Sequence, residues 1–271
     1  MARRRPAIRR SPPRAPRREP RREPRTLLRI AGLPAVSALF ATAPERVERL
    51  FFDDRMKLAA GSFCALLAEA HKPYRLVKPE ELERVAGTVL HGGIVAVAEP
   101  RPVPAFDPGE AARWAAENKP LLLLDGVGNP HNLGAIARTA AFFGVKRMVL
   151  SDHPGQAMPS DASYRIAEGG LEHVAVYRAA GFADALRRLR RSFRVLGTAL
   201  EAGRPLPSLA AADRPFALVL GNEETGLPRA TLAACDEIVT IGGSGLVQSL
   251  NVSVSAGILL CALERLGTAK K

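Results

Sequence analysis

The fold is decided by the stretch LLLLDGVGNPHNLGAIARTAAFFG, which occupies residues 121–144. Its four consecutive leucines predict a strand that is buried on both faces. Gly126, Gly128 and Pro130 indicate a turn, and a helix is expected from Asn132, whose side chain is placed to cap it. A buried strand, a polar turn and a helix in this order form the repeating unit of an α/β sheet.

The same alternation continues toward the end of the chain. Strands are expected at 147–151, 174–177, 194–200, 216–220 and 237–241, and helices near 132–143, 182–191 and 249–266. This pattern predicts an α/β domain over residues 118–271, built on a mostly parallel sheet with helices on both faces. Ligands of such sheets bind beyond the carboxyl ends of the strands, in the loops that follow them.

A second, smaller α/β domain is predicted over residues 30–99. Strand-like and helix-like apolar segments alternate there, at 33–40, 47–52, 62–70, 74–77, 80–85 and 93–98. The next residues, 100–117, include Pro100, Pro102, Pro104 and Pro108, which break both patterns. We therefore expect them to link the two domains.

The formal net charge of +12 is concentrated at the amino terminus. Residues 1–29 hold twelve Arg against two Glu, a net of +10, together with six Pro and no aromatic residue. Such a composition cannot bury a core, so we expect a disordered tail. Arginine forks match phosphate oxygens, which favours a flexible arm that contacts phosphates, although a tail that only improves solubility remains an alternative. The rest of the chain is nearly neutral at +2.

Several classes of protein are disfavoured by composition. Cys64, Cys235 and Cys261 are odd in number and far apart, which argues against a disulfide framework. The five His show no paired ligand spacing, so no metal site is expected. No apolar stretch reaches the roughly 18 to 20 residues that a membrane span needs. These features predict a cytoplasmic protein with no membrane partner.

The common nucleotide-binding motifs are incomplete. The segment from Gly243 to Gly245 begins like a dinucleotide-binding G-x-G-x-x-G, but Gln248 stands at the last position. The segment GNEETG at 221–226 continues with Leu-Pro where a P-loop requires Lys followed by Ser or Thr. Neither dinucleotide nor nucleoside triphosphate binding is supported.

Three polar loops follow apolar strands instead. The first carries Asn132 and Arg138, the second Glu223, and the third Ser249 and Asn251. Taken alone, each has an ordinary structural explanation: a cap and an arginine that reaches solvent, a strand-to-helix turn, and a well-capped helix with Ser249 as its cap.

Together, the loops carry a far more specific pattern. They contain N-x-G-x-x-x-R at 132–138, G-x-E-x-x-G at 221–226 and S-L-N-V-S at 249–253. In this order and spacing they resemble the three signature motifs of the SpoU/TrmH family of RNA ribose 2′-O-methyltransferases, in the SPOUT superfamily. The resemblance is strong over residues 118–266. Residues 30–99 look like the family's small substrate-binding domain, whereas the tail is not part of the pattern.

The resemblance implies a SPOUT-type α/β fold with a carboxyl-terminal trefoil knot, S-adenosylmethionine as cofactor, and a homodimer whose active site is completed across the interface. The implied substrate is a structured RNA, either tRNA or rRNA. The implied RNA-facing residues are Asn132, Arg138, Glu223, Ser249 and Asn251. The implied cofactor contacts are Leu220, Gly221, Ile241, Leu246 and Leu250.

One departure from the family pattern lies before the third motif. The family usually has Ile-Pro-Met where this chain has Ile241-Gly242-Gly243, and two glycines make the loop more flexible. This leaves a rival interpretation, a non-catalytic RNA-binding or ribosome-associated protein that keeps the fold without the cofactor. The complete polar set of Arg138, Glu223, Ser249 and Asn251 favours the enzyme.

Overall fold

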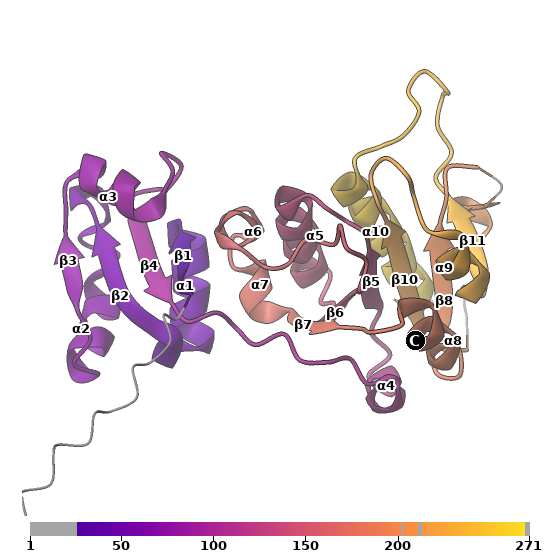
Figure 1. Ribbon diagram of the computed structural model, residues 1–271, viewed down its shortest axis with the longest axis horizontal. Coiled ribbons are helices and arrows are strands. Elements are labelled where there is room, and N and C mark those ends of the chain that lie inside the picture. Colours follow the sequence, from indigo (N-terminus) through magenta and orange to yellow (C-terminus); the bar gives the residue numbers. More distant parts are fainter. Residues whose placement is uncertain (1–25, 202, 211–212, 269–271) are drawn as a thin grey trace, which may run out of the picture.

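The computed structural model describes residues 26–201, 203–210 and 213–268, which form two sheets with helices around them (Figure 1). The smaller sheet has the strand order β1-β4-β2-β3. Its strands are β1 (Leu28–Ala31), β4 (Ile94–Ala98), β2 (Val47–Phe52) and β3 (Tyr74–Leu76). Strand β4 is antiparallel to both of its neighbours, and β3 is parallel to β2.

Three helices cover the smaller sheet: α1 (Leu33–Thr42), α2 (Gly61–Glu69) and α3 (Pro79–Ala86). The apolar residues of α1 and α2 pack into one cluster with Ile30 and Leu50 of the strands. On the opposite face, Leu82 of α3 packs against Val95 of β4. Residues 28–98, called the small domain below, therefore form three layers.

The larger sheet has the strand order β7-β6-β5-β10-β8-β11-β9, and every recorded pair within it is parallel. Residues 119–268, which contain this sheet, are called the large domain below. The strands are β5 (Leu121–Asp125), β6 (Arg147–Leu150), β7 (Ala175–Arg178), β8 (Arg194–Thr198), β9 (Arg204–Pro205), β10 (Phe216–Gly221) and β11 (Glu237–Thr240).

The leucines of β5 explain why helices lie on both faces of this sheet. Leu122 and Leu124 pack with α5 (Pro130–Phe142), α6 (Asp161–Ala167), α7 (Gly170–His173) and α10 (Val252–Thr268). Leu121 and Leu123 point the other way, toward α4 (Pro108–Ala115), α8 (Phe182–Leu189) and α9 (Arg229–Ala234). Because side chains alternate along a strand, four leucines in a row need an apolar cover on each face.

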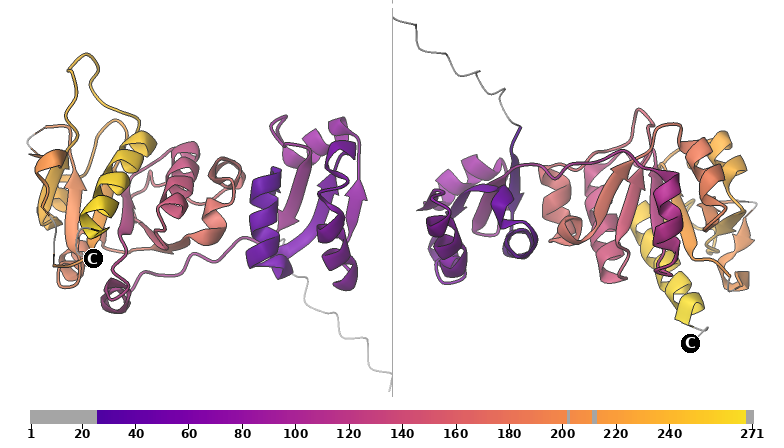
Figure 2. Two further views of the ribbon diagram at one scale, coloured as in Figure 1. Left: turned by 180° about the vertical axis from the view of Figure 1, so that it is seen from behind. Right: turned by 90° about the horizontal axis from the view of Figure 1, so that it is seen from below.

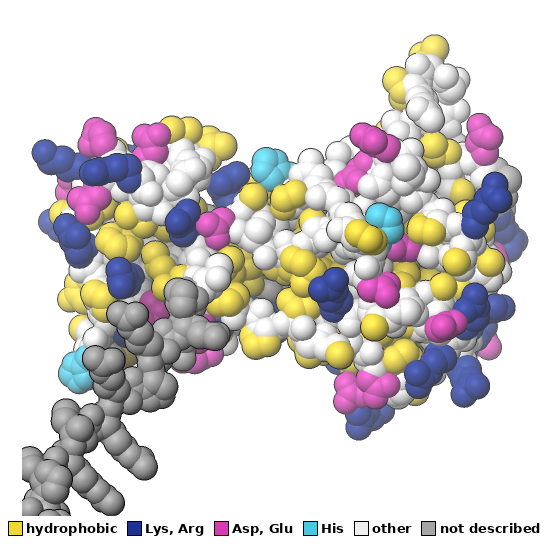
Figure 3. All heavy atoms as spheres, viewed as in Figure 1, with side chains coloured by type: hydrophobic (Ala, Val, Ile, Leu, Met, Phe, Trp, Pro, Cys, Tyr) yellow, Lys and Arg dark blue, Asp and Glu magenta, His cyan; other side chains and the backbone are white. Residues whose placement is uncertain are grey.

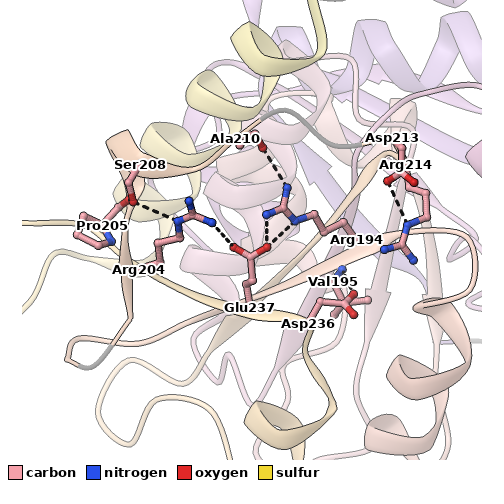
Figure 4. A network of polar contacts seen from close by, with 10 residues as sticks. All are labelled: Arg194, Val195, Arg204, Pro205, Ser208, Ala210, Asp213, Arg214, Asp236 and Glu237. Carbon is pink, nitrogen blue, oxygen red and sulfur yellow. Dashed lines mark hydrogen bonds and ion pairs between the residues drawn. The ribbon is translucent and has the colours of Figure 1, made fainter.

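Ion pairs tie the β8–β11–β9 edge of this sheet together (Figure 4). The Glu237 carboxylate on β11 accepts hydrogen bonds from Arg194 on β8, at 2.7 Å from Nε, and from Arg204 on β9, at 3.2 Å. Asp236 accepts from the backbone N–H of Val195 at 2.9 Å. These contacts hold β11 in register, which fixes the start of the loop that follows it.

The small domain lies beside α6 and α7 of the large domain (Figure 2), and buried polar contacts join the two. Arg46, directly before β2, makes an ion pair of 2.7 Å with Glu172 of α7, and only 2% of the Glu172 side chain is exposed. Arg101 donates to the backbone carbonyl groups of Leu171, Glu172 and Val174. The small domain is therefore held against the α6–α7 side of the large one.

The predicted α/β fold class is confirmed, and the predicted strands and long helices all form, within a few residues of the expected ends. Two differences concern the boundaries. Strand β1 begins at Leu28, inside the segment predicted as tail, because Leu28 and Ile30 pack into the core. Helix α4 lies inside the predicted linker 100–117, where Asp107 caps it. The rest of the predicted tail, residues 1–25, lies outside the described residues, and the knot stays a prediction.

Within the described residues, no helix is both long and apolar enough to cross a membrane. On the face shown in Figure 3, Lys and Arg side chains are spread over both domains and are interspersed with Asp and Glu. This distribution agrees with the near-neutral charge of the chain after residue 29.

Candidate active site

The candidate site lies where β5, β10 and β11 end. All three strands run parallel, so the loops that follow them emerge at the same edge of the large sheet (Figure 1). Strands β5 and β10 are direct neighbours, with Gly221 opposite Asp125. The three motif loops are therefore brought to one place by the topology.

A chain of hydrogen bonds joins one residue from each loop. The Asn132 side chain donates from Nδ2 to Oε1 of Glu223 at 2.6 Å. It also accepts at Oδ1 from Nδ2 of Asn251, at 3.0 Å. This Asn132–Glu223–Asn251 cluster connects residues that are 91 and 119 positions apart in the sequence.

Asn132 is free for this role because another residue caps its helix. Helix α5 begins at Pro130, and the Asn129 side chain accepts from the backbone N–H of His131 at 2.8 Å. The prediction that Asn132 caps the helix is wrong for this reason. Asn132 lies in the first turn, where its side chain points across to the neighbouring loops.

The turn after β10 is shaped by Asn222, which sequence analysis did not single out. Its Oδ1 accepts from the backbone N–H groups of Glu224 and Thr225, at 2.9 and 3.0 Å, and its Nδ2 donates to the Gly126 carbonyl at 2.8 Å. The available signal was an Asn directly after a buried strand, a position where Asx turns are common. These bonds place Glu223 toward Asn132.

A glycine is required at the base of the same turn. A Cβ added to Gly221 would lie 2.6 Å from the carbonyl carbon of Gly226, which is closer than side chains tolerate. The G-x-E-x-x-G motif thus brings its two glycines into backbone contact. Beneath the turn, buried Asp125 accepts a hydrogen bond of 2.6 Å from the Thr231 hydroxyl, which fixes the end of β5.

The helix that follows the third loop begins three residues later than the sequence predicts, at Val252 and not at Ser249. Helix α10 starts at Val252, and the Asn251 side chain accepts from the backbone N–H of Ser253 at 2.8 Å. Asn251, not Ser249, is therefore the cap, and Ser249 lies on the exposed segment before the helix. One Asn251 side chain both caps α10 and reaches Asn132, which fixes the amide at both ends.

Arg138 is not part of the cluster within one chain. It lies on α5, six residues after Asn132, which places it about 9 Å further along the helix axis and on a different face. Its guanidinium forms an ion pair of 2.9 Å with Glu168. The structure brings Asn132, Glu223 and Asn251 together, whereas Arg138 and Ser249 lie apart from them.

The predicted cofactor residues are also divided. Leu220 and Gly221 are buried at the end of β10, and Ile241 is half-buried after β11. Leu246 and Leu250 lie on the segment 242–251, which protrudes from the large domain (Figure 1), and they are 89% and 46% exposed. The segment carries apolar side chains that the protein itself does not cover.

Two other kinds of chemistry find no support near this edge. Burial raises the pKa of the Cys235 thiol to about 12, so it is not available as a thiolate nucleophile near neutral pH. The described part of the chain contains no group of three His, Cys, Asp or Glu side chains arranged to hold a metal ion. The site depends on amide, carboxylate and hydroxyl groups.

Comparison with known proteins identifies the family. Residues 119–261 match the model of the SpoU rRNA Methylase family, and residues 29–104 match a model described as RNA 2′-O ribose methyltransferase substrate binding. The first match spans more than half of the chain and includes all three motif loops. The chain belongs to the SpoU family of RNA methyltransferases.

Relatives within this family are similar over most of the chain. The 23S rRNA (guanosine-2′-O-)-methyltransferase RlmB of Nitrosomonas europaea is 33% identical over 234 residues, which cover 85% of this chain and 88% of the relative. The "Uncharacterized tRNA/rRNA methyltransferase YfiF" of Escherichia coli O157:H7 is 34% identical over 236 residues. That match covers 86% of this chain but 66% of the longer relative.

Solved structures of SpoU-type proteins have the same fold. The AdoMet-bound rRNA methyltransferase from Sinorhizobium meliloti superposes with a TM-score of 0.72 at 21% identity, over 88% of this chain and 87% of that one. The SpoU methyltransferase AviRb from Streptomyces viridochromogenes, in complex with AdoMet, has a TM-score of 0.70 at 22% identity and covers 90% and 91%. The resemblance inferred from the three motifs is thereby confirmed.

Proposed function

We propose that this SpoU-family protein transfers a methyl group from S-adenosylmethionine to the 2′ oxygen of a ribose in structured RNA. The observation that carries the proposal is the Asn132–Glu223–Asn251 cluster, in which each of the three family motifs contributes one side chain. A protein that only binds RNA would have no need to join these three loops by hydrogen bonds. The names of its relatives support tRNA or rRNA as the substrate.

The residues present fit S-adenosylmethionine. A Cβ at Gly226 would meet no atom within 4 Å, so the turn that begins at Gly221 leaves backbone groups at the end of β10 open to a ligand. Leu246 and Leu250 offer apolar surface of the kind that the purine ring of the cofactor requires. Together with Leu220 and Ile241 they would hold the cofactor, which supplies the electrophilic methyl group when it is bound.

The protein's task is to align the 2′ hydroxyl and to help it lose a proton. For the alignment, the Asn132–Glu223–Asn251 cluster orients the ribose, because its amide groups are fixed by partners on both sides and need no rearrangement. For the loss of the proton, Arg138 binds the adjacent RNA phosphate and lowers the energy of the developing alkoxide. A guanidinium does not release its proton near neutral pH, so we assign Arg138 to phosphate binding and not to proton removal. Ser249 assists from the exposed segment.

A homodimer would bring Arg138 to a cluster that it does not contact within its own chain. Apolar side chains lie exposed on α5 and α10, including Phe142, Val254 and Ile258, which are 83%, 50% and 37% exposed. A second copy would bury them, as expected of a symmetric interface. The Arg138 of one subunit would then serve the cluster of the other.

Mixing two inactive variants tests this arrangement. Arg138→Ala and Asn132→Ala are each expected to lower the rate of methyl transfer to a small residual value. If the site is shared, co-refolding equal amounts restores about a quarter of the wild-type rate, because half of the dimers contain one complete site of two. A mixture that stays inactive although mixed dimers have formed would mean that Arg138 and the cluster must come from the same subunit, and would refute the shared site.

The function itself is tested by calorimetry and by methyl transfer. The wild-type protein is titrated with S-adenosylmethionine and then supplied with methyl-labelled cofactor and total cellular RNA. We expect saturable binding and label in ribose, and loss of the label in Asn132→Ala. Neither binding nor label in the wild type would favour the non-catalytic RNA-binding protein.

A further inference from the structure

The ion pair between Arg138 and Glu168 links a residue of the first motif to one outside all three motifs. Nη2 of Arg138 lies 2.9 Å from Oε2 of Glu168, and the side chains are 58% and 46% exposed. Within the described part of the chain, this is the single recorded partner of the Arg138 side chain. A guanidinium has five N–H donors, so most of them remain open to an incoming phosphate.

Glu168 is held in an unusual backbone conformation. It follows α6 with a φ of +45°, in the left-handed region that residues other than glycine seldom adopt. Asn, Asp and Gly are the residues commonly found there, and Glu is not. Residues in such strained conformations are often found at functional sites. The conformation of Glu168, together with its ion pair to Arg138, therefore indicates a functional role more strongly than an ion pair on a regular helix would.

The backbone on its carboxyl side is packed tightly. A Cβ at Gly169 would lie 2.7 Å from the Cβ of Ala38 in the small domain. A Cβ at Gly170 would lie 2.7 Å from the Cα of Arg138 itself. The backbone that follows Glu168 is thus packed between α1 of the small domain and α5, which fixes the position of Glu168 relative to Arg138.

We infer that Glu168 is a positioning residue for Arg138: it fixes one end of the guanidinium and leaves the other donors directed to RNA phosphate. The inference rests on the proposed function of Arg138. Without Glu168 the exposed arginine samples several rotamers, and the correct one must be selected again in each reaction. The carboxylate also repels phosphate slightly, so its loss does not weaken RNA binding.

The loss of arginine positioning and the loss of repulsion toward phosphate are expected to change kcat and KM differently. In Glu168→Gln, kcat for methyl transfer falls about threefold, in line with the strength of an exposed ion pair, while KM for RNA stays equal or decreases. Glu110→Gln is the matched control, because Glu110 is also 46% exposed and forms a 2.9 Å ion pair, with Arg113 on α4. The control leaves both constants unchanged.

A double-mutant cycle separates positioning from a general loss of charge. In an Arg138→Gln background, the further change Glu168→Gln has no additional effect on kcat if Glu168 acts through Arg138. Equal effects in both backgrounds, or a wild-type kcat in the single variant, would overturn the inference. A wild-type protein that transfers no methyl group would instead refute the proposed function. RNA affinity is measured by filter binding in either case, because the proposal predicts that Glu168→Gln does not weaken it.

Discussion

Replacing Asn132 by Asp tests whether the hydrogen-bonded cluster carries the activity. The change preserves the shape of the side chain but replaces the amide N–H group, which donates to Glu223 at 2.6 Å, by an oxygen. Two carboxylates then face each other at hydrogen-bond distance. The other bond, in which Asn251 donates to residue 132 at 3.0 Å, can be kept.

The size of the effect follows from charge and burial. Two like charges about 4 Å apart repel by about 1 kcal/mol in water and about 4 kcal/mol at an effective dielectric constant of 20. Asn132 and Glu223 are half-buried, so the repulsion lies between these limits. Loss of a hydrogen bond to a charged group adds about 1.5 to 3 kcal/mol. If about 2 kcal/mol of this total appears in the transition state, the rate falls roughly 30-fold.

The assay is single-turnover methyl transfer to RNA at several pH values. We expect a large loss for Asn132→Asp in alkaline buffer and a smaller one in mildly acidic buffer, because one proton between the two carboxylates replaces the missing N–H donor. Asn129→Asp is the control: the same chemical change on the same helix, at a cap where Asp serves as well as Asn. A wild-type rate for Asn132→Asp at every pH would refute the role of the cluster.

Four further outcomes are expected. Gly134→Ala should destabilise the protein by about 1 to 3 kcal/mol in urea unfolding, because the added Cβ lies 2.5 Å from a carbonyl oxygen of α6. Arg46→Ala leaves a buried carboxylate without its cation and should cost about 3 to 5 kcal/mol, with faster proteolysis between the domains. Hydrogen bonds from Arg147, and then from Lys146, lower the pKa of Glu117 from 4.5 to about 2. The contribution of Glu117 to folding stability is therefore complete above pH 4.5 and is lost as the pH falls to about 2. The difference in Tm between the wild type and Glu117→Gln should shrink over that interval. Deleting residues 1–25 removes eleven Arg and two Glu and should weaken RNA binding and its salt dependence, while leaving the methylated nucleotide unchanged when modified positions are mapped.

The secondary structure was largely predictable because apolar patterns decide it. Leu121–Leu124 must be covered on both faces, and the structure covers them with helices from both sides. Strand β1 was missed because its few residues directly follow the Arg-Pro segment, whose composition dominated the interpretation. Helix α4 was missed because Pro108 was read as a helix breaker, whereas it stands at the first turn, where proline is well tolerated.

The same reasoning explains the two wrong caps. Asn129 lies directly before α5 and Asn132 lies in its first turn. A sequence pattern cannot decide which of the two caps the helix, because Pro130 also permits an earlier start. Ser249 and Asn251 pose the same ambiguity at α10. In both cases the start of the helix decides which side chain satisfies the backbone and which one is free for chemistry.

The relation between Asn132 and Arg138 shows what a motif can and cannot specify. Six residues apart on one helix, they face different directions, so a single ribose within one subunit cannot contact both. Asn132 is fixed by two other loops, and Arg138 by Glu168, whose neighbour Gly169 packs against the small domain. The presence of both residues within one motif is therefore explained if the RNA spans two surfaces or if two subunits share one site. The exposed apolar faces of α5 and α10 favour the shared site, since the same contact that buries them would also carry Arg138 across to its partner.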